Sequence, residues 1–228
     1  AMPTDIPTEG IFAVYKERGM TSHDVVDAVR RATGERRVGH AGTLDPLAKG
    51  VLVVGVGRAA TRLLGRLTEK DKEYVTRIHL GVRSTTDDGE GKKEEVPVDE
   101  IPSEDDVRAS LHRFSGVISQ RPCAFSALKL QGRPAYRLAR KNHDLELAPR
   151  QVEVKEIELL AYKWPWVDVR MVTGPGVYVR AIARDLGETL GTGGYVEELE
   201  RTRVGPYTAD QAVRVCDLRR GGPLTQSP

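Results

Sequence analysis

The chain of 228 residues is long enough for one sizeable domain. Its 39% hydrophobic and 30% charged residues are an ordinary soluble balance, and neither a membrane-spanning run nor a signal-peptide pattern is present, so we expect a cytoplasmic protein. The net charge of +2 favours no class of partner, and two isolated cysteines, Cys123 and Cys216, indicate neither a disulfide framework nor a metal site.

The first third of the chain predicts two strands and two helices. Residues 11–15 predict a short strand, and the helix that follows begins after Thr21 or Ser22 and stops at Gly34. The run of β-branched residues at 51–54 is typical of a buried strand, and a helix is expected over 60–71.

The rest of the chain mixes strands with helices but has no regular βαβ alternation, which favours an α+β fold with a mixed, largely antiparallel sheet. A strand is predicted at 73–82, with Tyr74, Thr76, Ile78 and Leu80 on one face, and a polar loop at 85–95. Ser103 and Asp106 indicate a capping box at the start of a helix. The remaining expected elements are strands at 150–164 and 166–174 and a helix that begins within 177–191.

Charge is distributed unevenly along the sequence. Residues 87–106 carry ten acidic residues against two lysines, a segment that would repel a polyanion. Residues 121–150 carry seven basic residues against two acidic ones, a net charge of +5 that could bind phosphates. A solvated helix face would give the same basic pattern.

Asp45 lies in the segment GTLDPLAKGVLVVGVG, where a glycine-bounded Asp-Pro precedes the apolar strand. The carboxylate could act as a nucleophile or general base, although Asp-Pro is also a common turn. The same segment contains Gly55, Gly57 and Ala60 at the spacing of a dinucleotide-binding fingerprint. That match is weak, because the acid expected at the end of the next strand is missing and no parallel alternation surrounds it.

A second turn, Gly174-Pro175-Gly176, precedes Tyr178 and Arg180. The planar guanidinium of Arg180 is suited to bind a carboxylate or a phosphate. A surface arginine after a tight turn is the alternative.

Taken together, six ordered segments resemble the TruB family of tRNA pseudouridine synthases, from about Gly10 to Tyr207. They are KERGMTSHDVV, GHAGTLDPLAKGVLVVGVGRAATR, DKEYVTRIHLG, FSALKLQGRPAYRLAR, GVYVRAIARDLG and ERTRVGPY. The resemblance implies the pseudouridine synthase fold, with helices flanking the sheet and an RNA-binding insertion at about 121–150. It implies isomerisation of the T-loop uridine at position 55 of tRNA, with no cofactor and no metal.

By this resemblance Asp45 is the catalytic nucleophile, attacking either the ribose or the base. Tyr74 stacks on the flipped base, and Arg180 pairs with the Asp45 carboxylate. His40 takes the place of the extruded base in the RNA stack. The expected substrate-binding residues are His40, Gly42, Thr43, Lys16, Tyr178, Lys129, Arg133, Tyr136, Arg137, Arg140 and Lys141.

Two positions depart from the family pattern. Tyr15-Lys16-Glu17 stands where Asp-Lys-Pro is usual, and Glu200 stands in a segment that usually reads LRRTR. The resemblance further implies one catalytic domain over 1–215 and a tail at 216–228 without the C-terminal PUA domain. We expect a monomer that binds the T arm of tRNA, needs no protein partner and contacts no membrane.

Two other functions share these features. An RNA-binding folding factor would use the basic insertion and His40 without chemistry. A guide-dependent relative would need accessory proteins and is disfavoured by the short chain.

Overall fold

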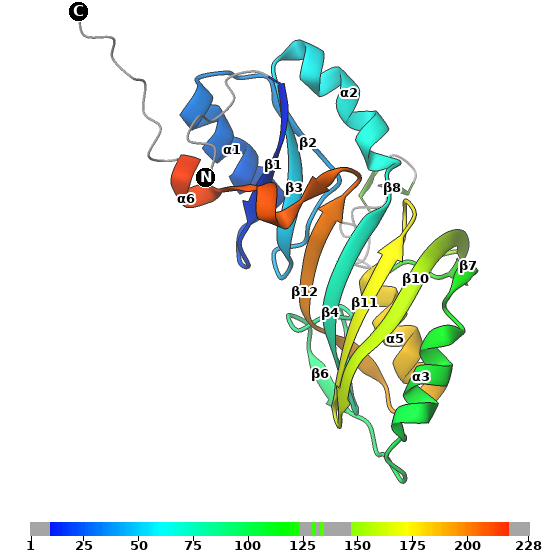
Figure 1. Ribbon diagram of the computed structural model, residues 1–228. Helices are drawn as coiled ribbons and strands as arrows, with labels where there is room; N and C mark the ends of the chain where they lie inside the picture. The colour runs from blue at the N-terminus through cyan, green and yellow to red at the C-terminus, as the bar shows by residue number, and fades with distance from the viewer. Residues whose placement is uncertain (1–9, 124–128, 131–132, 135–146, 219–228) are drawn as a thin grey trace, which may run out of the picture. The chain divides into compact units, whose positions relative to one another are not determined.

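The computed structural model describes residues 10–123, 129–130, 133–134 and 147–218, which belong to two compact units (Figure 1). The first unit contains residues 10–73 and 200–218, and the second contains the described residues of 74–199. Strands β4 (Lys72–Leu80) and β12 (Gly194–Val204) contribute residues to both. The predicted α+β class with a mixed, largely antiparallel sheet is confirmed.

The sheet of the first unit has the strand order β14-β1-β3-β12. Strand β1 (Gly10–Lys16) runs antiparallel to β3 (Lys49–Val56), in register from Gly10 opposite Val56 to Lys16 opposite Gly50. Strand β2 (Val38–Ala41) is antiparallel to β3, whereas β3 pairs with β12 in parallel through Lys49 and Gly50. The short strands β13 (Tyr207–Thr208) and β14 (Val213–Arg214) pair with β12 and β1.

Helix α1 (Ser22–Thr33) covers one face of this sheet, and its ends are those that the sequence predicts. Thr21 is the N-cap and forms a capping box with Asp24, and Gly34 ends the helix in the left-handed conformation at φ 72°. Helix α6 (Val215–Leu218) packs against the same core. Alternate residues of β1 face opposite cores: Phe12 and Val14 lie in the core with α1, whereas Ala13 and Tyr15 lie in the core with Leu64 of α2 (Arg58–Thr68).

Helix α2 (Arg58–Thr68) follows β3 directly, as a dinucleotide-binding turn would require. The strands next to β3 in the sequence do not fit that function, because β1 and β2 both run antiparallel to it and β3 pairs in parallel only with the distant β12. Gly55 has a packing role instead: a Cβ there would lie 3.1 Å from Leu64 Cδ2 of α2. Gly55 thus permits close packing of α2 on β3.

The sheet of the second unit has the order β12-β4-β11-β10-β7. Strand β10 (Arg150–Lys163) is antiparallel to β11 (Trp166–Thr173) and to β7 (Gly116–Gln120). Strand β4 alternates as predicted, with Lys72, Tyr74, Thr76, Ile78 and Leu80 buried. Apart from this sheet, β8 (Lys129–Leu130) pairs with β9 (Arg133–Pro134).

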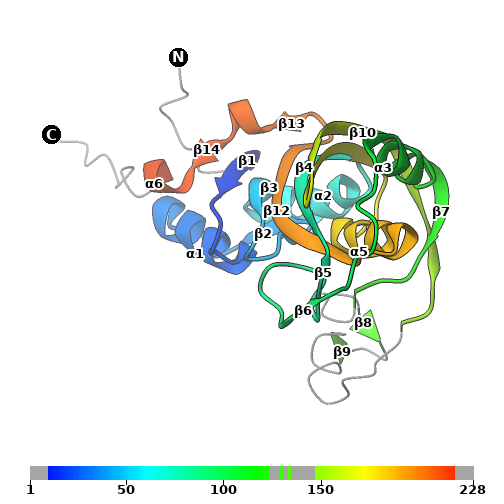
Figure 2. The same ribbon diagram turned by 90° about the horizontal axis from the view of Figure 1, so that it is seen from below.

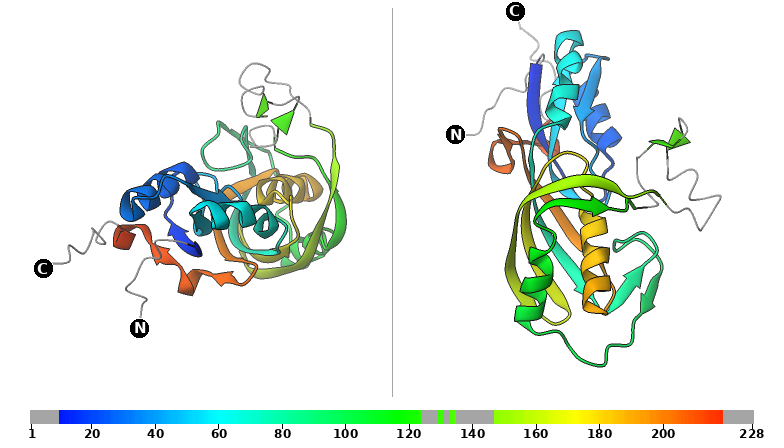
Figure 3. Two further views of the ribbon diagram at one scale, coloured as in Figure 1. Left: turned by 90° about the horizontal axis from the view of Figure 1, so that it is seen from above. Right: turned by 90° about the vertical axis from the view of Figure 1, so that its right-hand side faces the viewer.

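Helices α3 (Glu104–His112) and α5 (Val179–Leu190) pack against each other, and α3 also contacts β10 (Figures 2 and 3). The predicted capping box of Ser103 with Asp106 is present. Part of the segment predicted as a polar loop at 85–95 is a strand, because β6 (Lys93–Glu95) pairs with β5 (Val82–Ser84). Within the described ranges, every helix is too short or too polar to cross a membrane.

Candidate active site

Asp45 lies in the loop that joins β2 to β3, which we call the Asp45 loop (residues 42–48). Leu44 and Leu47 anchor this loop in the interior, and Asp45 is half-buried between them. The Asp45 carbonyl accepts a hydrogen bond from Ala48 N at 2.9 Å, which closes the turn. Ser22, at the start of α1, binds both backbone groups of Leu44, donating to its oxygen at 3.0 Å and accepting from its nitrogen at 2.9 Å.

Lys16, at the end of β1, has no exposed surface. Its Nζ donates to the carbonyls of Met20 at 2.6 Å, Glu17 at 3.0 Å and Pro46 at 3.4 Å. Burial lowers the pKa of Lys16 to about 8, and the nearby Asp45 carboxylate acts in the opposite direction. The predicted substrate-binding role of Lys16 stays a prediction; in the structure its ammonium binds the Pro46 carbonyl of the Asp45 loop.

Arg201 of β12 is a second buried cation at this loop, with 2% of its surface exposed. Its Nε donates to Val51 O at 2.9 Å and its Nη2 to Gly42 O at 3.0 Å. Its backbone lies so close to β3 that a Cβ on Gly50 would be 2.1 Å from Arg201 O. The sequence did not predict this role, because Arg201 stands in a run of charged residues that resembles a surface.

The two departures from the family pattern contact each other. Tyr15 precedes Lys16 and Glu200 precedes Arg201, and Tyr15 OH donates to Glu200 Oε1 at 2.9 Å. Burial, followed by the Glu200 hydrogen bond, raises the pKa of Tyr15 to about 12. The two unusual residues thus form one contact beside the two cations that hold the Asp45 loop.

His40 lies on β2, opposite Val54, and is half-buried. Burial lowers the pKa of His40, and the charge of Arg201 lowers it further. The ring is therefore neutral at pH 7. Gly42, at φ 84°, and the exposed Thr43 begin the loop that leads from β2 to Asp45.

Arg180 belongs to the second unit, in the first turn of α5, and is 5% exposed. Its Nη1 donates to Thr86 O at 3.1 Å and lies 3.8 Å from Asp88 Oδ2. Asp88 is also buried and accepts hydrogen bonds from Thr86 Oγ1 at 2.6 Å and Glu90 N at 3.0 Å. Sequence reasoning missed Asp88, because it treated residues 85–95 only as a polar loop.

Tyr178 is the N-cap residue of α5. Its backbone pairs with the buried amide of Gln120, which accepts from Tyr178 N at 2.9 Å and donates to Tyr178 O at 3.1 Å. The Arg150 guanidinium lies 5.1 Å from the centroid of the Tyr178 ring and donates to Gly176 O at 2.6 Å. Tyr74, the other predicted aromatic of the site, is 8% exposed on β4.

The predicted residues fall into two groups. Lys16, His40, Gly42, Thr43 and Asp45 lie together in the first unit, whereas the second unit contains Tyr74, Tyr178 and Arg180. The pairing of Asp45 with Arg180 and the stacking role of Tyr74 stay predictions. Of the predicted RNA grip, Lys129 and Arg133 lie on β8 and β9, and the other four lie outside the described residues: Tyr136, Arg137, Arg140 and Lys141.

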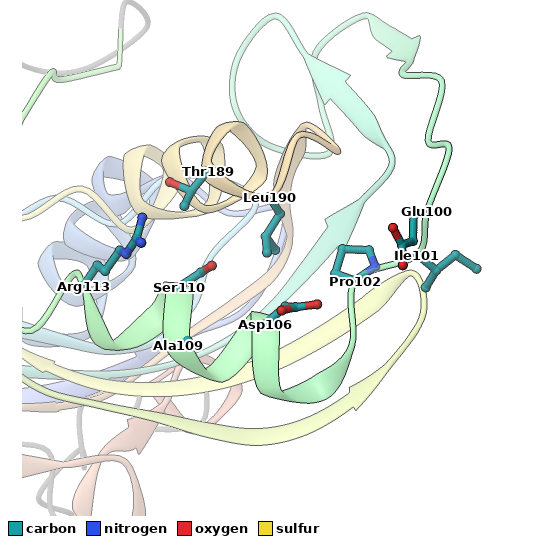
Figure 4. Close-up of a pocket in the computed structure, with 9 residues that line it drawn as sticks. All are labelled: Glu100, Ile101, Pro102, Asp106, Ala109, Ser110, Arg113, Thr189 and Leu190. Atoms are coloured by element: carbon teal, nitrogen blue, oxygen red, sulfur yellow. The ribbon is translucent and has the colours of Figure 1, made fainter.

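A separate pocket of about 460 Å³ lies between α3, the end of α5 and residues 100–102 (Figure 4). Asp106, Arg113 and Thr189 are among its lining residues, and none of the predicted site residues is. No group of three or more metal-ligating side chains is found in the part of the chain that the structure describes.

Comparison with known proteins links the chain to one family. The family model for the TruB family pseudouridylate synthase N-terminal domain matches residues 30–179, and that for the tRNA pseudouridylate synthase B C-terminal domain matches residues 180–221. The chain is 48% identical to tRNA pseudouridine synthase B of Thermobifida fusca over 92% of this chain and 74% of the relative. It is 45% identical to that of Mycobacterium tuberculosis over 96% and 74%.

Among solved structures, the chain resembles one from a Cbf5-Nop10-Gar1 complex, with a TM-score of 0.70 and 29% identity. It also resembles one from an H/ACA RNP bound to a substrate RNA, with a TM-score of 0.68 and 27% identity. Each match covers 94% of this chain but only 56% of the solved chain.

Proposed function

Because the chain belongs to the TruB family and is an isomerase that converts uridine in tRNA to pseudouridine, we propose that its target is the uridine at position 55 of the T loop and that Asp45 is the nucleophile. The curated relatives that match the chain at 45–48% identity are all described as tRNA pseudouridine synthase B. They favour free tRNA as the substrate over an RNA held by a guide complex.

In this reaction the Asp45 carboxylate attacks the target nucleotide and the bond from the ribose to the base nitrogen breaks. The detached base rotates, and a bond from the same ribose carbon to a base carbon forms in its place. The carbon then loses its proton, the base nitrogen gains one, and Asp45 is released, so the product is an isomer of the substrate. A carboxylate suits this chemistry because it can bond to an electron-poor ribose carbon, as in retaining glycosidases.

The observation that carries the proposal is the way in which the Asp45 loop is held. Ser22 fixes Leu44, while the buried cations of Lys16 and Arg201 bind carbonyls on either side of Asp45. A reactive group fixed before the substrate arrives avoids an entropic penalty in the transition state. A simple surface turn would not require two fully buried cations, whose desolvation is unfavourable.

The other residues have supporting roles. The neutral ring of His40 can replace the extruded base in the RNA stack, and Tyr74 can stack on the flipped base and help to remove its proton. Arg180 orients the Asp45 carboxylate. Lys129 and Arg133, together with the basic residues outside the described ranges, bind the phosphates of the T arm. We further propose that the protein acts in the cytoplasm, as a monomer without a protein partner.

The direct test is incubation of the protein with an unmodified tRNA transcript, without metal or nucleotide. Pseudouridine is mapped by carbodiimide labelling and primer extension. We expect a single stop at the T-loop uridine with the wild-type chain and none with Asp45→Asn, which should still bind tRNA. Asp27→Asn, which changes a half-buried carboxylate on α1 that pairs with Arg30, is the matched control and should retain activity.

A stop at a different uridine would refute the proposed target. Substantial product from Asp45→Asn would refute its role as nucleophile. If the wild-type chain bound tRNA but made no pseudouridine, the result would contradict the enzymatic function and favour a role as an RNA-folding factor.

A further inference from the structure

Arg184 lies four residues after Arg180, one turn further along α5, and its side chain is 12% exposed. Its guanidinium contacts three parts of the second unit. Nε donates to Asp185 Oδ1 at 3.0 Å, Nη1 lies 3.3 Å from Asp87 Oδ2, and Nη2 donates to Arg121 O at 2.6 Å. A planar group with several donors can link such segments rigidly, whereas a lysine could not.

Asp87, the acidic partner, has unusual backbone geometry. Its φ is 60°, the only positive value for a non-glycine residue in the described ranges. Such a conformation is unfavourable and persists only where the surroundings enforce it. Here Asp87 N donates to Ser84 O at 3.1 Å and its carbonyl accepts from Val196 N at 3.0 Å.

The Asp87 carboxylate is mostly buried, and burial raises its pKa. The charge of Arg184 is the largest opposing influence, and the Cys123 thiol also contacts this carboxylate. Cys123 is itself 1% exposed, and burial raises its pKa to about 12. Arg184 is thus the main group that compensates the buried charge of Asp87.

The residues on either side of Asp87 are those that contact Arg180. Thr86 supplies the carbonyl at 3.1 Å, and Asp88 supplies the carboxylate oxygen at 3.8 Å. Figures 2 and 3 show the β5–β6 hairpin that carries these residues beside α5. A change in the backbone of Asp87 would therefore move these two contacts of Arg180 at once.

We propose that Arg184 is a positioning residue: its ion pair with Asp87 fixes the turn that carries Thr86 and Asp88, and this turn sets the orientation of the Arg180 guanidinium. The inference rests on the proposed function, in which Arg180 orients Asp45. Without Arg184, the Asp87 carboxylate loses the cation that compensates most of its buried charge, and it turns toward solvent. Thr86 O and Asp88 then leave Arg180, while the RNA-binding surface is unchanged.

The test compares four variants with the wild-type protein: Arg184→Met, Arg184→Lys, Arg180→Lys and the double variant of Arg184→Met with Arg180→Lys. Three quantities are measured for each: the single-turnover rate of pseudouridine formation at saturating enzyme, the Kd for tRNA by filter binding, and the midpoint of urea unfolding. The matched control is Arg77→Met, which removes another arginine–aspartate pair of this unit, with Asp168 at 2.8 Å.

We expect Arg184→Met to lower the rate by about 10-fold to 100-fold, the range for a misplaced catalytic group, with the Kd for tRNA unchanged. Arg184→Lys should recover only part of the rate. In the Arg180→Lys background, Arg184→Met should lower the rate much less than in the wild type, because both changes act on one interaction. Arg77→Met should leave the rate unchanged.

An unchanged rate in folded Arg184→Met would overturn the inference and leave the proposed function intact. A raised Kd with an unchanged rate would also overturn it, since Arg184 would then bind RNA. So would additive effects of the Arg184 and Arg180 changes. Absence of product from the wild-type chain would instead refute the proposed function, so the two failures are distinguishable.

Discussion

The buried ammonium of Lys16 predicts an unusual dependence of stability on pH. Burial lowers its pKa to about 8, against an ordinary value of 10.5. Between these two values the unfolded chain binds a proton at Lys16 that the folded chain has lost. The free energy of unfolding therefore rises with pH across this window, and the contribution of Lys16 is lost again as the pH falls through 8.

The size of the effect follows from the two pKa values. A difference of one in pKa corresponds to about 1.4 kcal/mol, so the full window contributes roughly 3 kcal/mol. Below pH 7 both states hold the proton and the contribution of Lys16 is constant. The free energy of unfolding of the wild type, minus that of Lys16→Met, should thus rise by roughly 3 kcal/mol between pH 7.5 and 10.5.

The assay is urea unfolding followed by tryptophan fluorescence at a series of pH values. Taking the difference between the two proteins removes the groups that titrate equally in both. Asp45→Asn provides a second check, because the Asp45 carboxylate raises the pKa of Lys16. In that variant the rise should begin at a lower pH. Parallel curves for the wild type and Lys16→Met would refute the assignment of Lys16 as a buried cation.

Two further predictions concern the same unit. Gly50→Ala should strongly destabilise the fold, by about 2 kcal/mol or more, because Gly50 has φ 116° and its Cβ would meet Arg201 O. Gly65→Ala on α2 is the control: a Cβ there meets open space, so this change should raise the urea midpoint instead. The imidazole of His40 should titrate below its ordinary pKa of 6.5 in an NMR series, so that its contribution to stability is present above pH 6.5 and lost in acid. A midpoint at or above 6.5 would contradict its burial.

Capping residues, apolar patterns and terminal glycines predicted the helices and strands that have these signals within their own segments. Helix α1 has a capping residue, an apolar stripe and a terminal glycine, and all three have the structural roles that the sequence predicts. The apolar run at 51–54 predicts a buried strand, and all four residues are buried. The position of Asp45 between a glycine-bounded turn and this strand was visible in the same way, although its chemical role came only from the family resemblance.

Strand β12 was missed for a physical reason. It carries Glu197, Glu198, Glu200, Arg201 and Arg203, a composition that favours a surface, yet it pairs with β3 and β4. Arg201 is buried there because two carbonyls from distant parts of the chain accept its hydrogen bonds. Such partners are a property of the tertiary structure, and the spacing of residues within one segment contains no signal for them.

The importance of Asp88 was hidden by its acidic neighbours. It stands in a segment with ten acidic residues, eight of which are exposed, and composition alone does not distinguish the buried Asp88 and the mostly buried Asp87 from the rest. Its buried charge is compensated by Arg180 of α5 together with hydrogen bonds from Thr86 Oγ1 and Glu90 N, and the link to α5 exists only in the folded chain.

The manner in which Lys16 and Arg201 hold the Asp45 loop limits how this loop can be transplanted. Its shape is not encoded in residues 42–48, because the cations that bind its carbonyls come from β1 and β12, at opposite ends of the sequence. A graft of the loop alone would leave those carbonyls without donors, and Asp45 would lose its fixed direction. The smallest portable unit is therefore four strands, β1, β2, β3 and β12, together with the start of α1.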